Sequence, residues 1–168
     1  MTNTRTLVLT ALMTSLAMVL HYVESLIPVP YVMPGAKLGL ANVVALYAVL
    51  TWGTGRAVLI NALRTVAVSL ILGTFMSPGF ILAFSGALLS ALVMGKTRRL
   101  AGDCLSAVGL SVVGAVTHNI GQLLAAAYIV RQAGVLFYLP YLLLFAIPTG
   151  TFIGLVVSRL PGTLKKRG

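Results

Sequence analysis

The fold is decided by long apolar stretches such as residues 104–130, which read CLSAVGLSVVGAVTHNIGQLLAAAYIV. This stretch contains no Lys, Arg, Asp or Glu, and it exceeds the ~20 apolar residues that a helix needs to cross a bilayer. Over the whole chain of 168 residues, 59% are hydrophobic and only 8% are charged, and the mean hydropathy is +1.04. A soluble domain carries about 25% charged residues. The sequence therefore predicts an all-α integral membrane protein whose residues 1–168 form a single membrane domain.

Proline, glycine and basic residues divide the chain into six apolar segments. We expect six transmembrane helices, at about residues 6–26, 37–52, 57–73, 78–95, 104–130 and 136–160. The first segment lacks the small-residue cleavage site of a signal peptide, so it is expected to remain as a helix. Pro140 and Pro148 are expected to kink the last helix or to shorten its start.

The basic residues predict the orientation of these helices. Nine of the twelve Lys and Arg residues fall near the two termini and in the loops after the second and fourth helices, whereas Lys37 and Arg131 fall on the other side. Because cytoplasmic loops are enriched in Lys and Arg, we expect both termini to be cytoplasmic. We attribute the net charge of +10 to topology and to contacts with anionic lipid headgroups, not to nucleic-acid binding.

Polar side chains within the apolar segments gather towards the outer side of the membrane. At a rise of ~1.5 Å per residue, one level holds His21, Glu24, Lys37, Asn42, His118, Asn119 and Gln122. Spacings of three and four residues place His21 with Glu24, and His118 with Gln122, on shared helix faces. These faces should turn inward, because polar groups that face lipid lack hydrogen-bond partners. We expect a substrate-binding site; the alternatives are hydrogen bonds that only hold the bundle together, or a headgroup position for His21, Glu24 and Lys37.

Arg64 is the one basic residue expected within a span. A charge at the centre of a transmembrane helix costs ~2.5–3.5 kcal/mol on insertion scales, so it needs a partner or access to water. Counting residues from the cytoplasmic helix ends places Glu24 about 15 Å higher in the membrane. Asn61, one turn below Arg64, is therefore the expected partner instead. Two interpretations stay open: Arg64 extends towards the cytoplasm, or it binds an anion at the floor of the site.

Small residues and the single cysteine carry further information. Ala11 with Ser15, and Gly150 with Gly154, have the spacing that lets helix backbones approach closely, within one bundle or between subunits. Cys104 alone cannot form an internal disulfide or a cysteine-based zinc site. We predict no catalytic residue, no metal site and no cofactor, and the chain has no ATP-binding P-loop motif.

Three motifs give the sequence a family resemblance. They are the short first helix with Ala11-x-x-x-Ser15, the string Pro34-Gly35-Ala36-Lys37-Leu38-Gly39-Leu40-Ala41-Asn42 that ends the proline-rich first loop, and His118-Asn119-Ile120-Gly121-Gln122-Leu123. Over essentially its whole length the sequence resembles the Gx transporter family, also labelled heptaprenyl diphosphate synthase component I. That family resembles the substrate-binding S components of energy-coupling factor (ECF) transporters.

The resemblance implies a six-helix S-component fold in a prokaryotic plasma membrane, with a small-molecule pocket that opens outward beneath the first loop. It also implies that the Ala11 and Ser15 face contacts a transmembrane coupling (T) subunit, which two cytoplasmic ATPases drive. The function expected from it is capture of a small vitamin-like or precursor molecule for an ECF-type importer. The expected site contains Lys37, Arg64 and two histidines but only one acid. We therefore expect this substrate to be anionic or rich in hydrogen-bond acceptors.

Two other functions remain as alternatives. The family label suggests a membrane subunit associated with a prenyl diphosphate synthase. Such a subunit would be non-catalytic, because that chemistry needs carboxylates to hold Mg²⁺ and this chain has two acids in total. The third function is an ion channel or proton-coupled carrier, against which stands the lack of a buried carboxylate relay.

Overall fold

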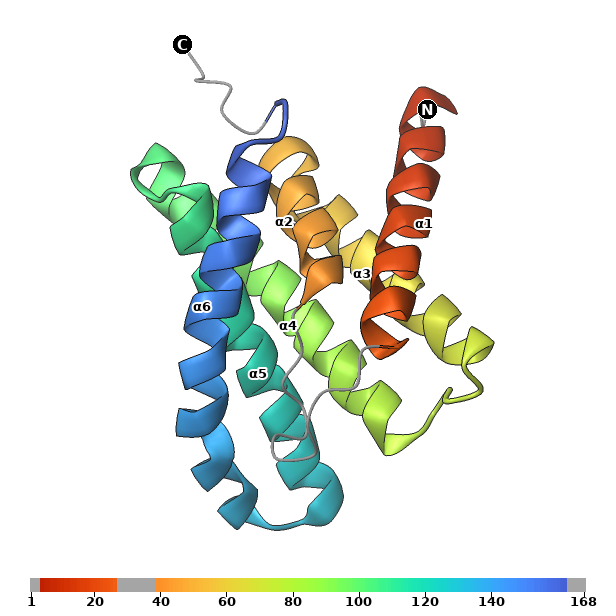
Figure 1. Cartoon of the computed structure of the whole chain (residues 1–168), viewed down its shortest axis with the longest axis vertical. Coiled ribbons are helices and arrows are strands. Elements are labelled where there is room, and N and C mark those ends of the chain that lie inside the picture. The colour runs from red at the N-terminus through yellow and green to blue at the C-terminus, as the bar shows by residue number, and fades with distance from the viewer. Residues whose placement is uncertain (1–3, 27–38, 163–168) are drawn as a thin grey trace.

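The computed structural model describes residues 4–26 and 39–162, and these residues form a bundle of six α-helices (Figure 1). The α-helices are α1 (Thr4–Leu26), α2 (Leu40–Trp52), α3 (Thr54–Ile71), α4 (Pro78–Ala101), α5 (Ala107–Val130) and α6 (Leu139–Ser158). Two short 3₁₀ helices, η1 (Gly102–Cys104) and η2 (Ala133–Tyr138), lead into α5 and α6. The described residues contain no strand, so the all-α prediction is confirmed.

Five helical segments are long and apolar enough to cross a membrane: α1, α3, α4, α5 and the continuous stretch Ala133–Ser158. The chain is a multi-pass membrane protein. The second predicted crossing differs, because α2 has only 13 residues and spans about 20 Å, less than the ~30 Å thickness of a hydrocarbon core. The predicted start at Lys37 lies outside the described residues. Helix α2 contacts all five other α-helices and therefore lies at the centre of the bundle.

Other helix ends also differ from the sequence prediction. Helix α4 continues to Ala101, so the basic segment from Lys96 to Arg99 is helical and not a loop. No proline or glycine interrupts that segment before Gly102, and the last turn contains basic side chains that suit the negative end of the helix dipole. Helix α5 begins at Ala107 instead of Cys104, because the Ser106 hydroxyl caps it by accepting a hydrogen bond from the Gly109 N–H at 3.1 Å.

The start of the last helix is shortened at Pro140, as predicted, and a kink at Pro148 stays a prediction. Pro140 lies in the first turn of α6, where its missing N–H costs nothing, and η2 occupies the residues before it. Pro148 lies inside α6.

Glycines bring α6 and α5 into close contact. A Cβ atom added at Gly150 would lie 2.9 Å from the Val112 Cα, and one added at Gly154 would lie 2.4 Å from the Val108 Cα. The small-residue pair on α6 therefore serves packing within this chain. Ala11 and Ser15 on α1 differ, since both are exposed. Their contact with a partner subunit stays a prediction.

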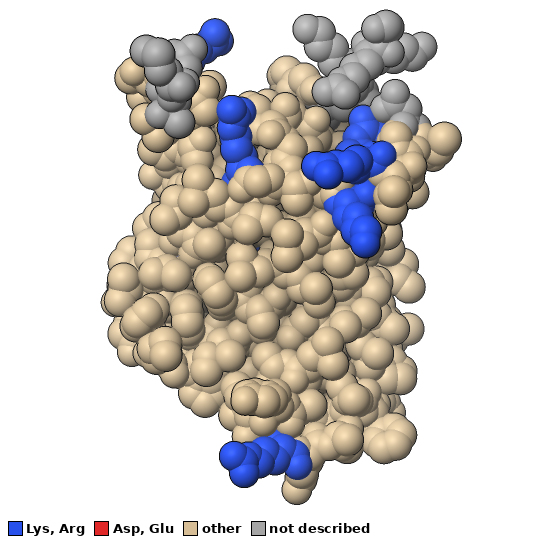
Figure 2. All heavy atoms as spheres, turned by 180° about the vertical axis from the view of Figure 1, so that it is seen from behind, with Lys and Arg blue, Asp and Glu red and all other residues tan. Residues whose placement is uncertain are grey.

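Basic side chains are concentrated at one end of the bundle (Figure 2). This is the end at which α1 begins and α6 finishes (Figure 1). Arg131 caps α5 at the opposite end, where α5 turns into η2. The described basic residues that the sequence analysis assigns to one side of the membrane thus lie at one end of the folded bundle. The cytoplasmic orientation of that end stays a prediction.

Candidate functional site

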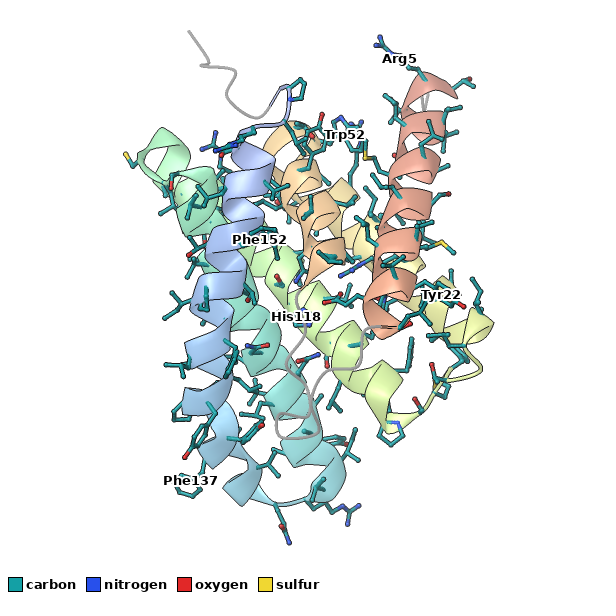
Figure 3. The ribbon with its side chains drawn as sticks, viewed as in Figure 1. Arg5, Tyr22, Trp52, His118, Phe137 and Phe152 are labelled. Atoms are coloured by element: carbon teal, nitrogen blue, oxygen red, sulfur yellow. The ribbon has the colours of Figure 1, made fainter. Side chains whose placement is uncertain are left out.

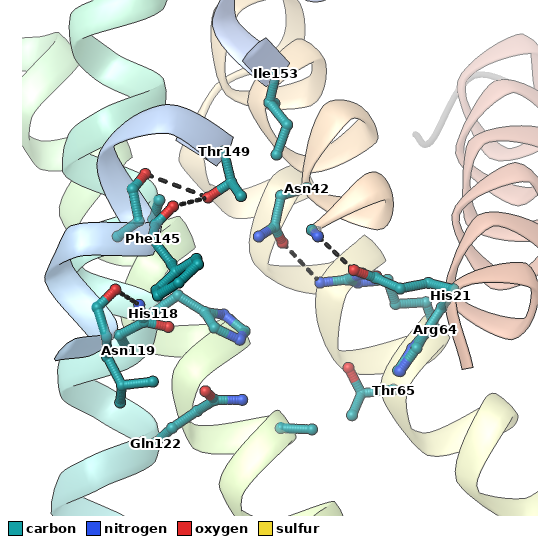
Figure 4. Close-up of a pocket in the computed structure, with 16 residues that line it drawn as sticks. His21, Asn42, Arg64, Thr65, His118, Asn119, Gln122, Phe145, Thr149 and Ile153 are labelled. Carbon is teal, nitrogen blue, oxygen red and sulfur yellow. Dashed lines mark hydrogen bonds between the residues drawn. The ribbon is translucent and has the colours of Figure 1, made fainter. Parts of the chain in front are cut away.

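The predicted polar side chains surround one cavity in the middle of the bundle (Figure 4). Its volume is about 50 Å³, and all six α-helices contribute to the 16 residues that line it. Seven of the eight predicted binding residues are among them: His21, Glu24, Asn42, Arg64, His118, Asn119 and Gln122. The eighth, Lys37, lies outside the described residues. The structure thus brings the described candidates together, and their role in binding a substrate stays a prediction.

Arg64 lies inside the bundle, with only 4% of its surface exposed. Its Nε donates a hydrogen bond to Asn61 Oδ1 at 2.8 Å, and its Nη2 donates one to Asn42 Oδ1 at 3.1 Å. Asn61 in turn donates from Nδ2 to the Ala87 carbonyl of α4 at 3.0 Å, which fixes the orientation of its amide. The expectation that Asn61 is a partner of Arg64 is confirmed, and the interpretation that Arg64 extends to the cytoplasm is wrong.

Glu24 lies much closer to Arg64 than the sequence analysis predicts. Both side chains line the same cavity, and an attractive electrostatic interaction joins them. The height estimate of about 15 Å is wrong, because it assumes parallel helices that start at one level. Figure 1 shows that α1 starts beyond the first turn of α3 and that α3 crosses the bundle obliquely.

The Glu24 carboxylate also joins the end of α1 to the start of α2. Its Oε1 accepts a hydrogen bond from the Gly39 N–H, and only 6% of the Glu24 surface is exposed. Gly39 adopts a positive φ of 74°. A Cβ there would lie 3.1 Å from both Asn42 Nδ2 and Ile153 Cδ1, so glycine suits this position in conformation and in size. The one acid in the cavity is therefore held in place by the backbone next to α2.

Helix α5 supplies the wall that faces Arg64. In Figure 4, His118 and Gln122 project from α5 towards the side on which Arg64, His21 and Thr65 lie. Gly86 of α4 allows this, since a Cβ at Gly86 would lie 2.8 Å from the His118 carbonyl oxygen and 2.8 Å from Gln122 Cγ.

The hydrogen bonds of α5 divide the candidates into two kinds. Asn119 donates from Nδ2 to the Leu142 carbonyl of α6 at 3.0 Å, so it holds two helices together as well as lining the cavity. Gln122 is 7% exposed, and its amide makes no hydrogen bond to any residue that the structure describes. Gln122 is accordingly the amide with donors and acceptors left for a ligand.

Sequence reasoning missed the contribution of α6 and two threonines. Thr65 and Thr149 line the cavity, and Phe145 and Ile153 add apolar surface from α6. The hydroxyls of both threonines donate to carbonyls one turn earlier, as threonine often does in helices. The position of Thr65 directly after Arg64 was the available signal. For α6 there was none, because its segment contains no charged or amide side chain.

One guanidinium, one carboxylate, two imidazoles and three amides line the cavity and could contact a small polar group. Asn61 and Asn42 use only two of the five N–H donors of Arg64. The volume of about 50 Å³ is far below the ~300–1,000 Å³ of pockets for drug-sized ligands. Within the described segments, no group of three His, Cys, Asp or Glu residues could hold a metal ion. The arrangement suits a compact anionic group more than a bulky ligand.

A family model described as heptaprenyl diphosphate synthase component I matches residues 13–160. The chain belongs to this family. The matched region includes every described residue around the cavity, from His21 to Ile153. Searches of curated proteins and of solved structures gave no match. Membership of the heptaprenyl diphosphate synthase component I family, also called the Gx transporter family, confirms the resemblance found in the sequence.

Proposed function

We propose that this member of the heptaprenyl diphosphate synthase component I family is the substrate-binding S component of an ECF-type importer. It captures a small anionic or acceptor-rich molecule from outside the cell. The observation that supports this proposal is the cavity itself, in which polar groups from separate helices converge inside a largely apolar bundle. Polar groups within a membrane bundle are costly and gather at ligand or ion pathways.

Arg64 favours an anionic substrate. Its guanidinium is held by Asn61 and Asn42 before any ligand binds, so little side-chain order has to be gained on binding. A planar guanidinium with free N–H donors suits a carboxylate or a phosphate. The Glu24 carboxylate does not remove this preference, since it accepts a hydrogen bond from the Gly39 N–H and Asn61 and Asn42 use only two of the five N–H donors of Arg64.

The first helix supports a partner role. Helix α1 exposes Ala11 and Ser15 together with large apolar side chains such as Leu12 and Leu16. In the importer this face contacts the T subunit. The sequence has no P-loop motif. In the proposed importer, two cytoplasmic ATPases provide the energy and this chain is a non-catalytic subunit.

The family description favours a second candidate, a non-catalytic membrane subunit of a heptaprenyl diphosphate synthase. The chain has two acids, of which Glu24 is buried against Gly39. Such a subunit would therefore leave the chemistry to a soluble partner. Purification from native membranes separates the two: the importer predicts a T subunit and ATPases in the complex, and the synthase predicts a soluble prenyltransferase.

The binding site itself is tested by mass spectrometry of the small molecules that the protein retains after gentle detergent extraction. His118→Ala and Asn42→Ala should each lose a species that the wild-type protein retains. Gln132→Ala, an exposed amide in the turn between α5 and η2, is the matched control and should retain it. A species that survives both cavity substitutions would refute the assignment of these residues.

A further inference from the structure

A second and larger space, an open groove and not an enclosed cavity, lies beside the polar cavity. Its volume is about 530 Å³, and it lies between α4, α5 and η2. Most of the side chains that line it are apolar, among them Leu82, Leu123, Ala126, Val135 and Phe137. We refer to this space as the apolar chamber.

The apolar chamber adjoins the polar cavity. Gln122 and Leu142 line both spaces. Along α5, His118 faces the polar cavity, Gln122 lies at the boundary, and Ala126 lies one turn further in the chamber. Figure 3 shows Phe137 nearer than His118 to the end at which α5 and α6 are joined. The chamber therefore lies towards the end of the bundle opposite the start of α1 and the end of α6 (Figure 1 and Figure 3).

Gln122 marks the boundary chemically. Its side chain is 7% exposed, has no hydrogen-bond partner among the described residues, and contacts both spaces. The described residues leave the donors and the acceptor of this amide unused, so a ligand that passes it could accept or donate a hydrogen bond. On the polar side of this point the ligand meets Arg64 and the histidines, and on the other side it meets hydrocarbon.

The two volumes indicate what kind of molecule fits. About 50 Å³ beside Arg64 admits a compact group, and about 530 Å³ beyond Gln122 admits a larger apolar group. From His118 to Ala126 the site extends about 12 Å along α5, at ~1.5 Å per residue. We propose that the bound molecule is an amphiphile, with a compact anionic head at Arg64 and an apolar arm in the chamber. This inference rests on the proposed function and specifies the substrate class of the same site.

The test is the binding of inorganic phosphate and of ethyl, butyl and hexyl phosphate to the wild-type protein in nanodiscs. Each buried CH₂ contributes ~0.8 kcal/mol, which corresponds to an affinity gain of about fourfold. We expect the affinity to rise along the series and Arg64→Gln to abolish binding of every member.

Two substitutions on α5 test where the arm lies. Ala126→Phe fills the chamber and should remove the gain with chain length while leaving inorganic phosphate binding unchanged. Ala127→Phe is the matched control, because Ala127 does not line the chamber, and it should keep the gain.

Three outcomes would overturn the proposal. Equal affinity for phosphate and hexyl phosphate would show that the arm is not bound, although the anion site and the proposed function would stand. A gain with chain length that persists in Arg64→Gln would show that the chamber only takes up lipid chains. If no member of the series bound, the proposal that an anionic head binds at Arg64 would be refuted. Ligand retention in mass spectrometry would then test the proposed function separately.

Discussion

The substitution Gly86→Ala should damage the site although Gly86 itself has no side chain that could bind a ligand. The added Cβ would lie 2.8 Å from the His118 carbonyl oxygen, 2.8 Å from Gln122 Cγ and 3.2 Å from His118 Cε1. The two side chains can rotate away, but the carbonyl oxygen belongs to the backbone of α5. Ordinary contact begins at 3.4 Å, so α4 and α5 must separate by about 0.6 Å (3.4 − 2.8).

The magnitude follows from these contacts. Forcing an extra methyl group into a packed core costs about 1–3 kcal/mol, so the free energy of unfolding should fall by that amount. Displacing His118 and Gln122 should remove the two hydrogen bonds that we propose they make to the ligand, each contributing about 0.5–1.5 kcal/mol. The sum of about 1–3 kcal/mol corresponds to a loss of affinity of roughly 5- to 150-fold.

The assay compares Gly86→Ala with Gly79→Ala on the same helix. A Cβ at Gly79 would meet only the Ser77 Oγ, at an ordinary distance of 3.8 Å. Thermal unfolding in detergent and the amount of retained ligand are measured for both variants and for the wild-type protein. Gly79→Ala should match the wild type within about 0.5 kcal/mol. If Gly86→Ala also matched it in both measurements, the close packing that positions His118 and Gln122 would be refuted.

Three further predictions concern positioning, packing and orientation. Asn61→Leu removes the acceptor of Arg64 Nε, and affinity for the retained ligand should fall at least tenfold, about 1.4 kcal/mol, in a titration; unchanged affinity would mean that Asn61 does not orient Arg64. Gly154→Ala introduces a Cβ only 2.4 Å from the α5 backbone, so the melting temperature should fall by several degrees, and an unchanged value would contradict the packing of α6 on α5. In intact cells a membrane-impermeant maleimide should label Arg131→Cys in a Cys104→Ser background, whereas native Cys104 should react only after permeabilisation; the reverse pattern would invert the orientation.

The helical fold could be predicted from the sequence because the bilayer, as the solvent of this chain, requires helices. A chain with 8% charged residues must bury its backbone polar groups in helices when it enters a bilayer. Proline and glycine then mark most of the boundaries, as Pro78 does at the start of α4. The exceptions are local: α2 is shorter than its apolar pattern predicts, and α4 runs on through Lys96 because charge alone does not end a helix.

The candidate site could be predicted for the same physical reason. Polar side chains within the membrane, such as Asn42 and Gln122, turn away from lipid and into the bundle. Most of the polar residues that the sequence places within the membrane therefore line the cavity. The proximity of Glu24 to Arg64 could not be predicted, because helix tilt and stagger depend on packing between helices. The apolar chamber has no sequence signal at all, since Leu82 or Ala126 looks like any other apolar residue in a span.

The most direct test of the central claim is an experimental structure of the protein purified with the ligand it retains. We expect ligand density in the central cavity, with an acidic group within hydrogen-bond distance of the Arg64 guanidinium and of the Gln122 amide. Density bound only to the exposed surface of α1, with Arg64 and Gln122 making no contact to the ligand, would contradict it.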